Sequence, residues 1–209
     1  KFKDTKALKI IERCVRDLIG FEIVETAQNH ITIKSISKHL DEEFPTILRR
    51  SFFILKQMVD LLQEGLAKKD KKLFEGIRPL ELTINKYTLF LKRIINRSGY
   101  KYPHYMYTLI FFLELAANHI EYIRRYYEFH PHSVLEAPAL KDCKRLVDLT
   151  SKTMELYYDF SFEKFQWIAE AQPHFFWFEK IKNPDIRFNF KAMAEYLVQM
   201  ARQIVALHT

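Results

Sequence analysis

The chain has 209 residues, of which 48% are hydrophobic and 28% charged, and its 33 Lys and Arg against 26 Asp and Glu give a formal net charge of +7. This composition excludes a disordered or collagen-like chain, and only four glycines beside 15% aromatic residues favour helices over the turn-rich β classes. The longest apolar runs, such as residues 109–113, are far shorter than the roughly 20 residues of a membrane-spanning helix. The sequence therefore predicts a chain of the all-α class without a membrane-spanning segment.

The first 43 residues are predicted to form a short helix and a β-hairpin. Residues 5–18 have the apolar spacing of a helix, while residues 21–25 and 31–36 alternate apolar and polar side chains on either side of a turn at residues 27–30. The chain begins at Lys1 rather than at Met, so we expect further residues upstream. We interpret this segment as the remnant of a larger N-terminal module.

From Phe44 onward, apolar residues recur at alternating spacings of four and three, which is typical of helices packed in bundles. Six such seams, separated by turn signals, predict two three-helix bundle repeats, one over residues 44–130 and one over residues 131–209. Pro45 is expected in the first turn of the first helix, Asp70 as the cap of the second, and Gly99 just after its end. The residues predicted to be buried in the first bundle are Leu55, Val59, Ile84, Leu91, Phe112 and Ile123.

Each predicted half holds a proline deep in its middle helix, Pro79 in the first half and Pro173 in the second. A proline inside a helix removes a hydrogen bond and clashes with the preceding turn, at a cost of about 3 kcal/mol, so we expect a kink at both positions. The matching positions also indicate an internal repeat.

Two cysteines, Cys14 and Cys143, lie far apart in sequence that is typical of helices. A disulfide framework therefore has little support, and we expect a reducing, cytoplasmic environment.

The basic residues are spread along the chain rather than gathered in one stripe. Arg49 and Arg50, the run at residues 68–72, and the pair Arg124 and Arg125 fall at helix ends or on expected solvent faces. We therefore interpret most of the positive charge as solvated surface. No specific DNA binding is expected, and any binding of duplex DNA should be weak and independent of sequence.

Two helices in the middle of the chain each carry a Glu-x-x-x-Asn pair, Glu81 with Asn85 and Glu114 with Asn118. Residues four apart lie on the same helix face, so each pair presents two oxygen-bearing side chains in one direction, as half of a metal site would. With the adjacent His119, these residues are candidate ligands for one ion. The alternative is a hydrogen-bonded helix face with a core histidine.

The chain resembles the PhoU-type phosphate uptake regulators, in particular their archaeal branch. The resembling stretches are residues 18–25 (Leu-Ile-Gly-Phe-Glu-Ile-Val-Glu), residues 48–58 (Leu-Arg-Arg-Ser-Phe-Phe-Ile-Leu-Lys-Gln-Met) and residues 113–119 (Leu-Glu-Leu-Ala-Ala-Asn-His). The last is similar to the family's Leu-Glu-Arg-Ile-Gly-Asp-His. The resemblance implies two three-helix repeats, with Glu/Asp-x-x-x-Asp motifs on the second and third helix of each repeat that hold iron or zinc.

The family's motif positions map onto Glu81 with Asn85, Glu114 with Asn118, Gln172 with Phe176, and Glu195 with Gln199. No pair keeps both carboxylates, and a neutral amide binds a cation less strongly than an anionic ligand does. Too little negative charge remains for a polynuclear cluster. We therefore expect at most one loosely held divalent or iron ion, near Glu81, Glu114 and His119.

Neither a Gly-rich phosphate loop nor a His-Glu-x-x-His motif is present in the sequence, and no nucleophile has an evident base, so we expect a protein that is not an enzyme. The aromatic run at residues 175–178 cannot turn all of its side chains into a helical core. We expect Phe175, Trp177 and Phe178 to contact a partner protein or a second copy in a dimer. A densely packed aromatic core is the alternative.

The resemblance implies a non-enzymatic regulator that restrains phosphate uptake by binding a phosphate transporter's ATPase or a membrane sensor kinase. Such a protein would be cytoplasmic, and peripheral at the membrane when bound to the transporter. The alternative is a transcription regulator, whose helical part is a sensor or dimerisation domain for an N-terminal AbrB-type DNA-binding module. A helical scaffold, or a bundle that binds a hydrophobic ligand, is a third interpretation.

Overall fold

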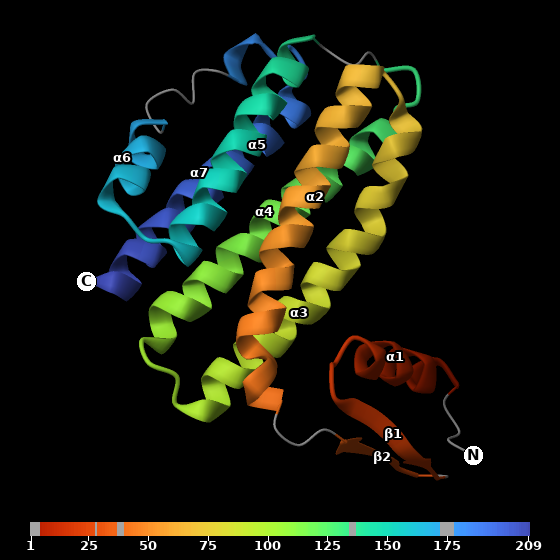
Figure 1. The fold of residues 1–209 in the computed structure, drawn as a ribbon. Helices are drawn as coiled ribbons and strands as arrows, with labels where there is room; N and C mark the ends of the chain where they lie inside the picture. The colour runs from red at the N-terminus through yellow and green to blue at the C-terminus, as the bar shows by residue number, and fades with distance from the viewer. Residues whose placement is uncertain (1–4, 28, 37–39, 134–136, 172–177) are drawn as a thin grey trace.

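The computed structural model describes residues 5–27, 29–36, 40–133, 137–171 and 178–209, and these are mostly helical with one β-hairpin (Figure 1). In these ranges, no helix combines the length and the apolar character needed to cross a membrane. The elements are α1 (Thr5–Arg16), β1 (Phe21–Thr26), β2 (Ile31–Ser35), the 3-10 helix η1 (Leu40–Glu43), α2 (Phe44–Lys68), the 3-10 helix η2 (Lys71–Gly76), α3 (Ile77–Ser98), α4 (Pro103–Phe129), α5 (Ala137–Tyr158), α6 (Phe162–Ala171) and α7 (Pro184–His208).

Several helix ends lie where local sequence signals placed them. Pro45 stands in the first turn of α2, where its missing N–H leaves no hydrogen bond unmade. Gly99 ends α3 with a φ of 61°, a left-handed conformation that glycine adopts without a steric penalty. Asn183 caps α7, because its Oδ1 accepts a hydrogen bond from the backbone N–H of Ile186 at 3.0 Å.

The predicted kink at Pro79 is wrong. Asp70 does act as a cap, but it caps the short helix η2, where its side chain accepts from the N–H of Lys72. The long helix α3 begins only at Ile77, so Pro79 lies in its first turn, where no intrahelical hydrogen bond is lost. Pro173 lies outside the described residues.

The long helices share one hydrophobic core. α4 lies against α7 along much of its length, and α2 lies against α5, so the helices of the two predicted bundles pack together (Figure 1). Five of the six residues predicted to be buried are buried. The exception is Phe112, which is partly buried at the edge of the core and stacks on Tyr196 of α7, with ring centroids 5.8 Å apart.

The predicted N-terminal helix and hairpin are present as a small unit beside α3 (Figure 1). β1 and β2 pair in antiparallel fashion, with Ile23 opposite Ile33, and α1 packs on β1. Arg93 of α3 joins the unit to the bundle, because its Nη2 donates to the carbonyl oxygen of Ile19 at 2.6 Å. The Arg93 guanidinium also lies over the ring of Phe21, 4.6 Å from its centroid.

Replacement of Ile84 by Ala is expected to lower the free energy of unfolding by about 2–5 kcal/mol, because its side chain is completely buried and the change leaves a cavity. Leu82, two residues away on the same helix, is 43% exposed, and Leu82→Ala should cost less than about 1 kcal/mol. Urea denaturation of both variants measures the difference. Equal losses would contradict the assignment of the inner face of α3.

Candidate functional site

A row of polar side chains joins α3 to α4, and we call it the α3–α4 seam. On α3 its members recur at spacings of three and four, so they lie on one helix face. The seam consists of Arg78, Glu81, Asn85, Thr88 and Lys92 on α3, and of Glu114, Glu121, Arg124 and Glu128 on α4.

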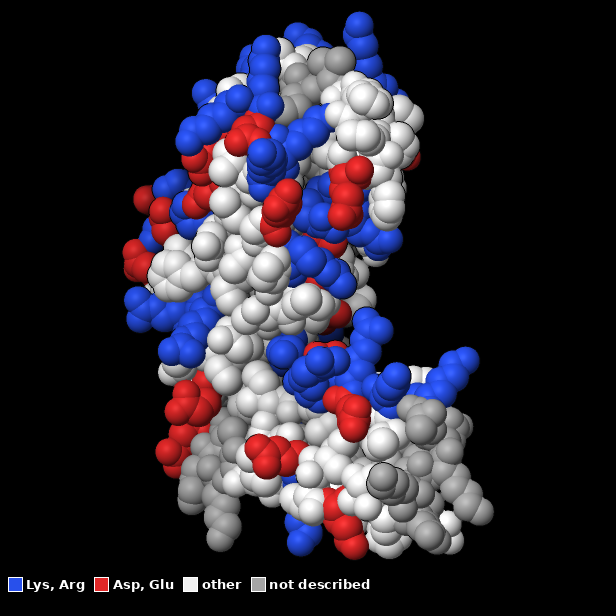
Figure 2. All heavy atoms as spheres, turned by 90° about the vertical axis from the view of Figure 1, so that its right-hand side faces the viewer, with Lys and Arg blue, Asp and Glu red and all other residues white. Residues whose placement is uncertain are grey.

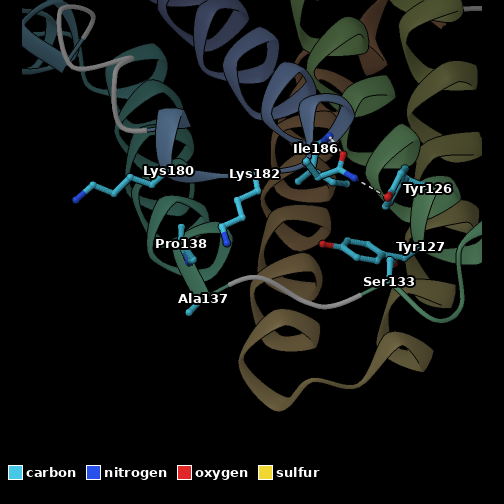
Figure 3. Close-up of a pocket in the computed structure, with 9 residues that line it drawn as sticks. Tyr126, Tyr127, Ser133, Ala137, Pro138, Lys180, Lys182 and Ile186 are labelled. Carbon is cyan, nitrogen blue, oxygen red and sulfur yellow. Dashed lines mark hydrogen bonds between the residues drawn. The ribbon is translucent and has the colours of Figure 1, made fainter.

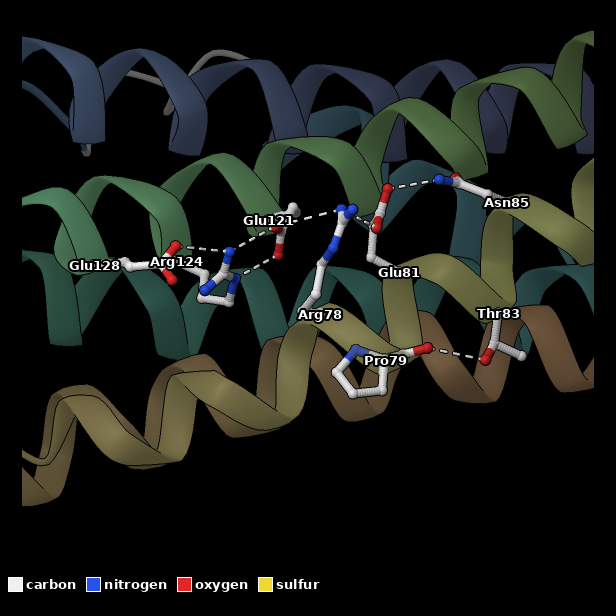
Figure 4. A network of polar contacts seen from close by, with 8 residues as sticks. All are labelled: Arg78, Pro79, Glu81, Thr83, Asn85, Glu121, Arg124 and Glu128. Atoms are coloured by element: carbon white, nitrogen blue, oxygen red, sulfur yellow. Dashed lines mark hydrogen bonds and ion pairs between the residues drawn. The ribbon is translucent and has the colours of Figure 1, made fainter. Parts of the chain in front are cut away.

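Glu81 is buried in this seam, with 5% of its surface exposed. One carboxylate oxygen accepts from Arg78 Nη1 at 2.7 Å, and the other accepts from Asn85 Nδ2 at 2.5 Å (Figure 4). Both oxygens therefore have a donor, and the negative charge is already balanced by a guanidinium from the same helix.

Glu114 is held in the same way by residues of the opposite helix. Its Oε2 accepts from Lys92 Nζ at 2.6 Å and from Thr88 Oγ1 at 2.8 Å. Lys92 in turn lies near the rings of Tyr107 and Phe111, at 5.7 and 5.2 Å from their centroids. The carboxylate thus faces an ammonium ion rather than an open coordination position.

Glu121 completes the seam at its other end. Arg124 reaches both of its oxygens, through Nε at 2.7 Å and Nη2 at 2.9 Å, and also contacts Glu128 at 3.1 Å (Figure 4). Arg78 lies 3.6 Å from Glu121, so one guanidinium faces buried carboxylates of two helices. These contacts raise the pKa of Arg124, first through the hydrogen bond to Glu121 and against the opposing effect of burial.

Asn85 lies in the seam between Glu81 and Thr88. Asn85 Oδ1 is buried and has no hydrogen-bond partner in the described structure, since its Nδ2 is the atom that faces Glu81. Asn118 is half-buried on α4. The amide of Asn85 is uncharged, and it stands on α3 between the residues that pair with Glu81 and those that pair with Glu114.

His119 belongs to a different interface. Its Nδ1 lies 2.7 Å from Oδ1 of Asn189 on α7, and Asn189 Nδ2 donates to the carbonyl oxygen of Asp185 at 2.7 Å. This pattern assigns a hydrogen to Nδ1, because the amide oxygen can only accept. The rings of Tyr122, Phe188 and Tyr196 surround the imidazole, and burial lowers the pKa of His119, against a smaller raising effect of the hydrogen bond to Asn189.

The five residues proposed as metal ligands are therefore not brought to one point. Glu81, Asn85 and Glu114 do share the α3–α4 seam, but Glu81 and Glu114 are paired with separate cations, and His119 hydrogen-bonds to α7. Asn118 is half-buried on α4. Within the described ranges, no group of three or more His, Cys, Asp or Glu side chains is placed to hold a metal ion. At the mapped positions of the second half, Gln199 Nε2 donates to Glu195 at 2.6 Å, while Gln172 and Phe176 lie outside the described residues.

The aromatic run was expected to supply a partner-binding surface. Phe178 is only 1% exposed and packs on Phe190 of α7, with ring centroids 5.8 Å apart, so it belongs to the core and the expectation for this residue is wrong. Phe175 and Trp177 lie outside the described residues.

A pocket of about 550 Å³ opens where the C-terminal end of α4 meets the N-terminal ends of α5 and α7 (Figure 3). Tyr126, Tyr127 and Lys182 are among its lining residues, none of which, within the described chain, is Asp or Glu. Asn183 Nδ2 donates to the Tyr126 hydroxyl at 2.5 Å. The wall of the pocket includes Ser133 and Ala137, the two neighbours of segment 134–136, which lies outside the described residues. We therefore assign no ligand to this pocket.

Neither a scan against models of known protein families nor comparisons with curated proteins and with solved structures find a protein that this chain matches. The likeness to PhoU-type regulators therefore rests on residues 18–25, 48–58 and 113–119 alone.

Sequence reasoning missed the cations that occupy the seam and the partner of His119. The pairing of Arg78 with Glu81 could have been predicted, because the two residues are three apart on one helix. The polar residues at positions 78, 81, 85, 88 and 92 also have the spacing of a second, polar face on α3. The contact between Lys92 and Glu114 joins two helices and carried no local signal.

Replacement of Lys92 by Met should destabilise the fold by about 1–3 kcal/mol, because Glu114 then keeps its charge in a partly buried place without a cation. Glu114→Gln in the same chain should recover part of the loss, as a double-mutant cycle would show. Lys86→Met is the matched control, because Lys86 is 37% exposed and its contact with Asp17 is long, at 4.0 Å, so this ion pair should contribute little to stability. An equal loss in the control would argue against a special role for the seam.

The stability of the fold should depend on pH through His119. Its pKa is lower in the folded chain than in the unfolded chain, so folding favours the neutral ring. This contribution is fully present above the unfolded pKa of about 6.5 and is lost as the pH falls through that value. Urea denaturation between about pH 7.5 and 5.5 should show a steeper loss of stability for the wild type than for His119→Gln. Identical pH profiles would place the imidazole in solvent.

Proposed function

We propose that this chain is a non-enzymatic regulator of the PhoU kind, which acts through protein contacts made by its helix faces. In this proposal α2 to α4 and α5 to α7 correspond to the two three-helix repeats, and the partner is a phosphate transporter's ATPase or a sensor kinase. The protein would work in the cytoplasm, at the membrane surface when its partner is there, as a monomer or as a homodimer.

The observation that carries the proposal is an aromatic stripe on the solvent side of α4. Tyr107, Phe111, Tyr122 and Phe129 follow one another at spacings of 4, 11 and 7 residues, so they lie on one face of the helix. All four are exposed, from 39% for Tyr107 to 67% for Phe129. A row of large apolar side chains along most of a helix marks a contact surface, because a surface helix is otherwise polar on its outer face.

The α3–α4 seam supports the same interpretation. Arg78 and Lys92 supply positive charge at the motif positions where the family resemblance implies a metal ion. The carboxylates are therefore neutralised by the chain itself, which supports a role in protein contact rather than in metal chemistry. Under this proposal, elemental analysis of protein purified without chelator should find less than one transition-metal ion per chain.

Affinity capture tests the proposed function. The tagged protein, expressed in cells of its source organism grown with and without phosphate, should retain a transporter ATPase or a sensor kinase. The double variant Phe111→Ser with Tyr122→Ser should lose that partner. Phe162→Ser with Trp167→Ser is the matched control, since both residues are exposed aromatics on α6, and it should keep the partner.

Capture of the same proteins by both variants would remove the α4 stripe from the interface. Capture of promoter DNA with no transporter or kinase would instead favour the transcription regulator. Retention of two or more metal ions per chain that are lost on Glu114→Gln would show that the amides and His119 suffice as ligands.

A further inference from the structure

The helix α1 carries a basic stripe that the spread of charge along the sequence conceals. Lys6, Lys9, Arg13 and Arg16 follow one another at spacings of 3, 4 and 3 residues, so they lie on one face of the helix, and all four are exposed. The opposite face is apolar and packs on the hairpin through residues that include Val15, which is 6% exposed. The expectation that no basic stripe exists is therefore wrong for this helix.

Three charges of this stripe, those of Lys9, Arg13 and Arg16, are not neutralised within the described structure. In that part of the chain, no ion pair involves Lys9, Arg13 or Arg16. Glu12 is the acidic residue of α1, and it stands at the edge of the stripe. Three cations with no carboxylate partner make a surface that attracts anions.

The bundle adds positive charge beside this helix. Lys86, Arg93 and Arg97 share one face of α3, and Arg93 joins the N-terminal unit to the bundle. Arg93 and Arg97 are four residues apart and therefore adjacent on this face. Burial first, and the neighbouring charge of Arg97 second, lower the pKa of Arg93. Figure 2 shows Lys and Arg side chains gathered in the corner where the unit meets the bundle and along the edge of the unit that faces this corner.

We propose that the basic stripe of α1 binds the phosphate backbone of a nucleic acid, without reading its sequence. The hairpin packs on the opposite face of α1, so the stripe faces away from the hairpin. Figure 2 shows Lys and Arg side chains around the corner between the N-terminal unit and the bundle, and a concave surface of this kind suits a rod-shaped polyanion better than a flat lipid bilayer. The stripe spans eleven residues, from Lys6 to Arg16, and is about 15 Å long, which matches about four phosphates of one strand of duplex DNA. The apolar face of α1 is covered by the hairpin, so it is not free to enter a bilayer.

This contact goes beyond the regulator proposed above, and it also differs from a hairpin that reads DNA bases. The strands β1 and β2 carry one basic residue, Lys34, against the exposed Glu22 and Glu25. The positive charge lies on the helix, which offers phosphate contacts and no element shaped to enter a groove of the duplex.

The experiment uses the full chain of 209 residues and a fluorescent DNA duplex of about 24 base pairs in two unrelated sequences, titrated between about 50 and 200 mM salt. Both duplexes should bind equally, and the logarithm of the affinity should fall with the logarithm of salt concentration with a slope of about −3. The triple variant Lys9→Gln, Arg13→Gln and Arg16→Gln should reduce this slope by close to its whole value and weaken binding by at least about tenfold.

The control variant removes the same charge from the other end of the bundle, as Lys72→Gln, Lys141→Gln and Lys144→Gln, and all three residues are exposed. It should change the affinity by less than about threefold. A second variant, Glu12→Gln, removes the carboxylate beside the stripe and should tighten binding, a gain that damage to the fold cannot produce. Unchanged or weaker binding by Glu12→Gln would count against the proposal.

Three results would overturn it. Equal weakening of binding by the stripe and control variants would show a general effect of net charge. Binding to phosphatidylserine vesicles with none to the duplex would assign the stripe to a membrane. Absence of duplex binding at the lowest salt would remove the nucleic acid altogether.

Discussion

The structure depends on the packing of α4 against three other helices, α2, α3 and α7, at the same time. Its apolar residues, such as Leu113 and Ile120, are completely buried in the core shared with α2 and α7, while Glu114 and Glu121 face α3 across the seam. The period of the helix fixes these rows relative to one another. A slip of α4 against α7 would therefore also draw its carboxylates away from the cations of α3. The same constraint determines which row is left for solvent, and that row carries the aromatic stripe.

The α3–α4 seam determines the register of the two helices more than it adds to the stability of the fold. Ion pairs that are partly or fully buried contribute little net stability, because the loss of hydration opposes their attraction, but a buried carboxylate without its cation is costly. Glu81 and Glu121 are both nearly inaccessible, and Arg78 lies close to each. Any register of α3 against α4 that separates these charges is penalised. The seam thus aligns the two helices, which an apolar interface alone would leave free to slide.

Local signals predicted the helix boundaries well and the seam poorly, for one physical reason. Gly99 ends a helix through its own backbone, so its effect is visible in the sequence. Pro79 was misplaced because a capped start at residue 70 is satisfied by one short 3-10 helix, and only the tertiary packing decides that α3 begins later. The pairing of Lys92 with Glu114 joins residues 22 apart on different helices. Spacing along one helix predicts which side chains share a face, but not what lies opposite them.

The N-terminal unit is too small to form a core of its own, since a two-stranded hairpin and one helix bury little apolar surface. Its orientation is therefore set by α3, through Arg93 and through the packing of Ile19 against the bundle. The hairpin covers the apolar side of α1, so the basic side must face outward. The basic stripe and the aromatic stripe thus lie on separate elements. α1 is oriented by the hairpin, and α4 by its packing against α2, α3 and α7. Charge on one and apolar surface on the other suit ligands of different chemistry, so substitutions in one stripe can be made without touching the other.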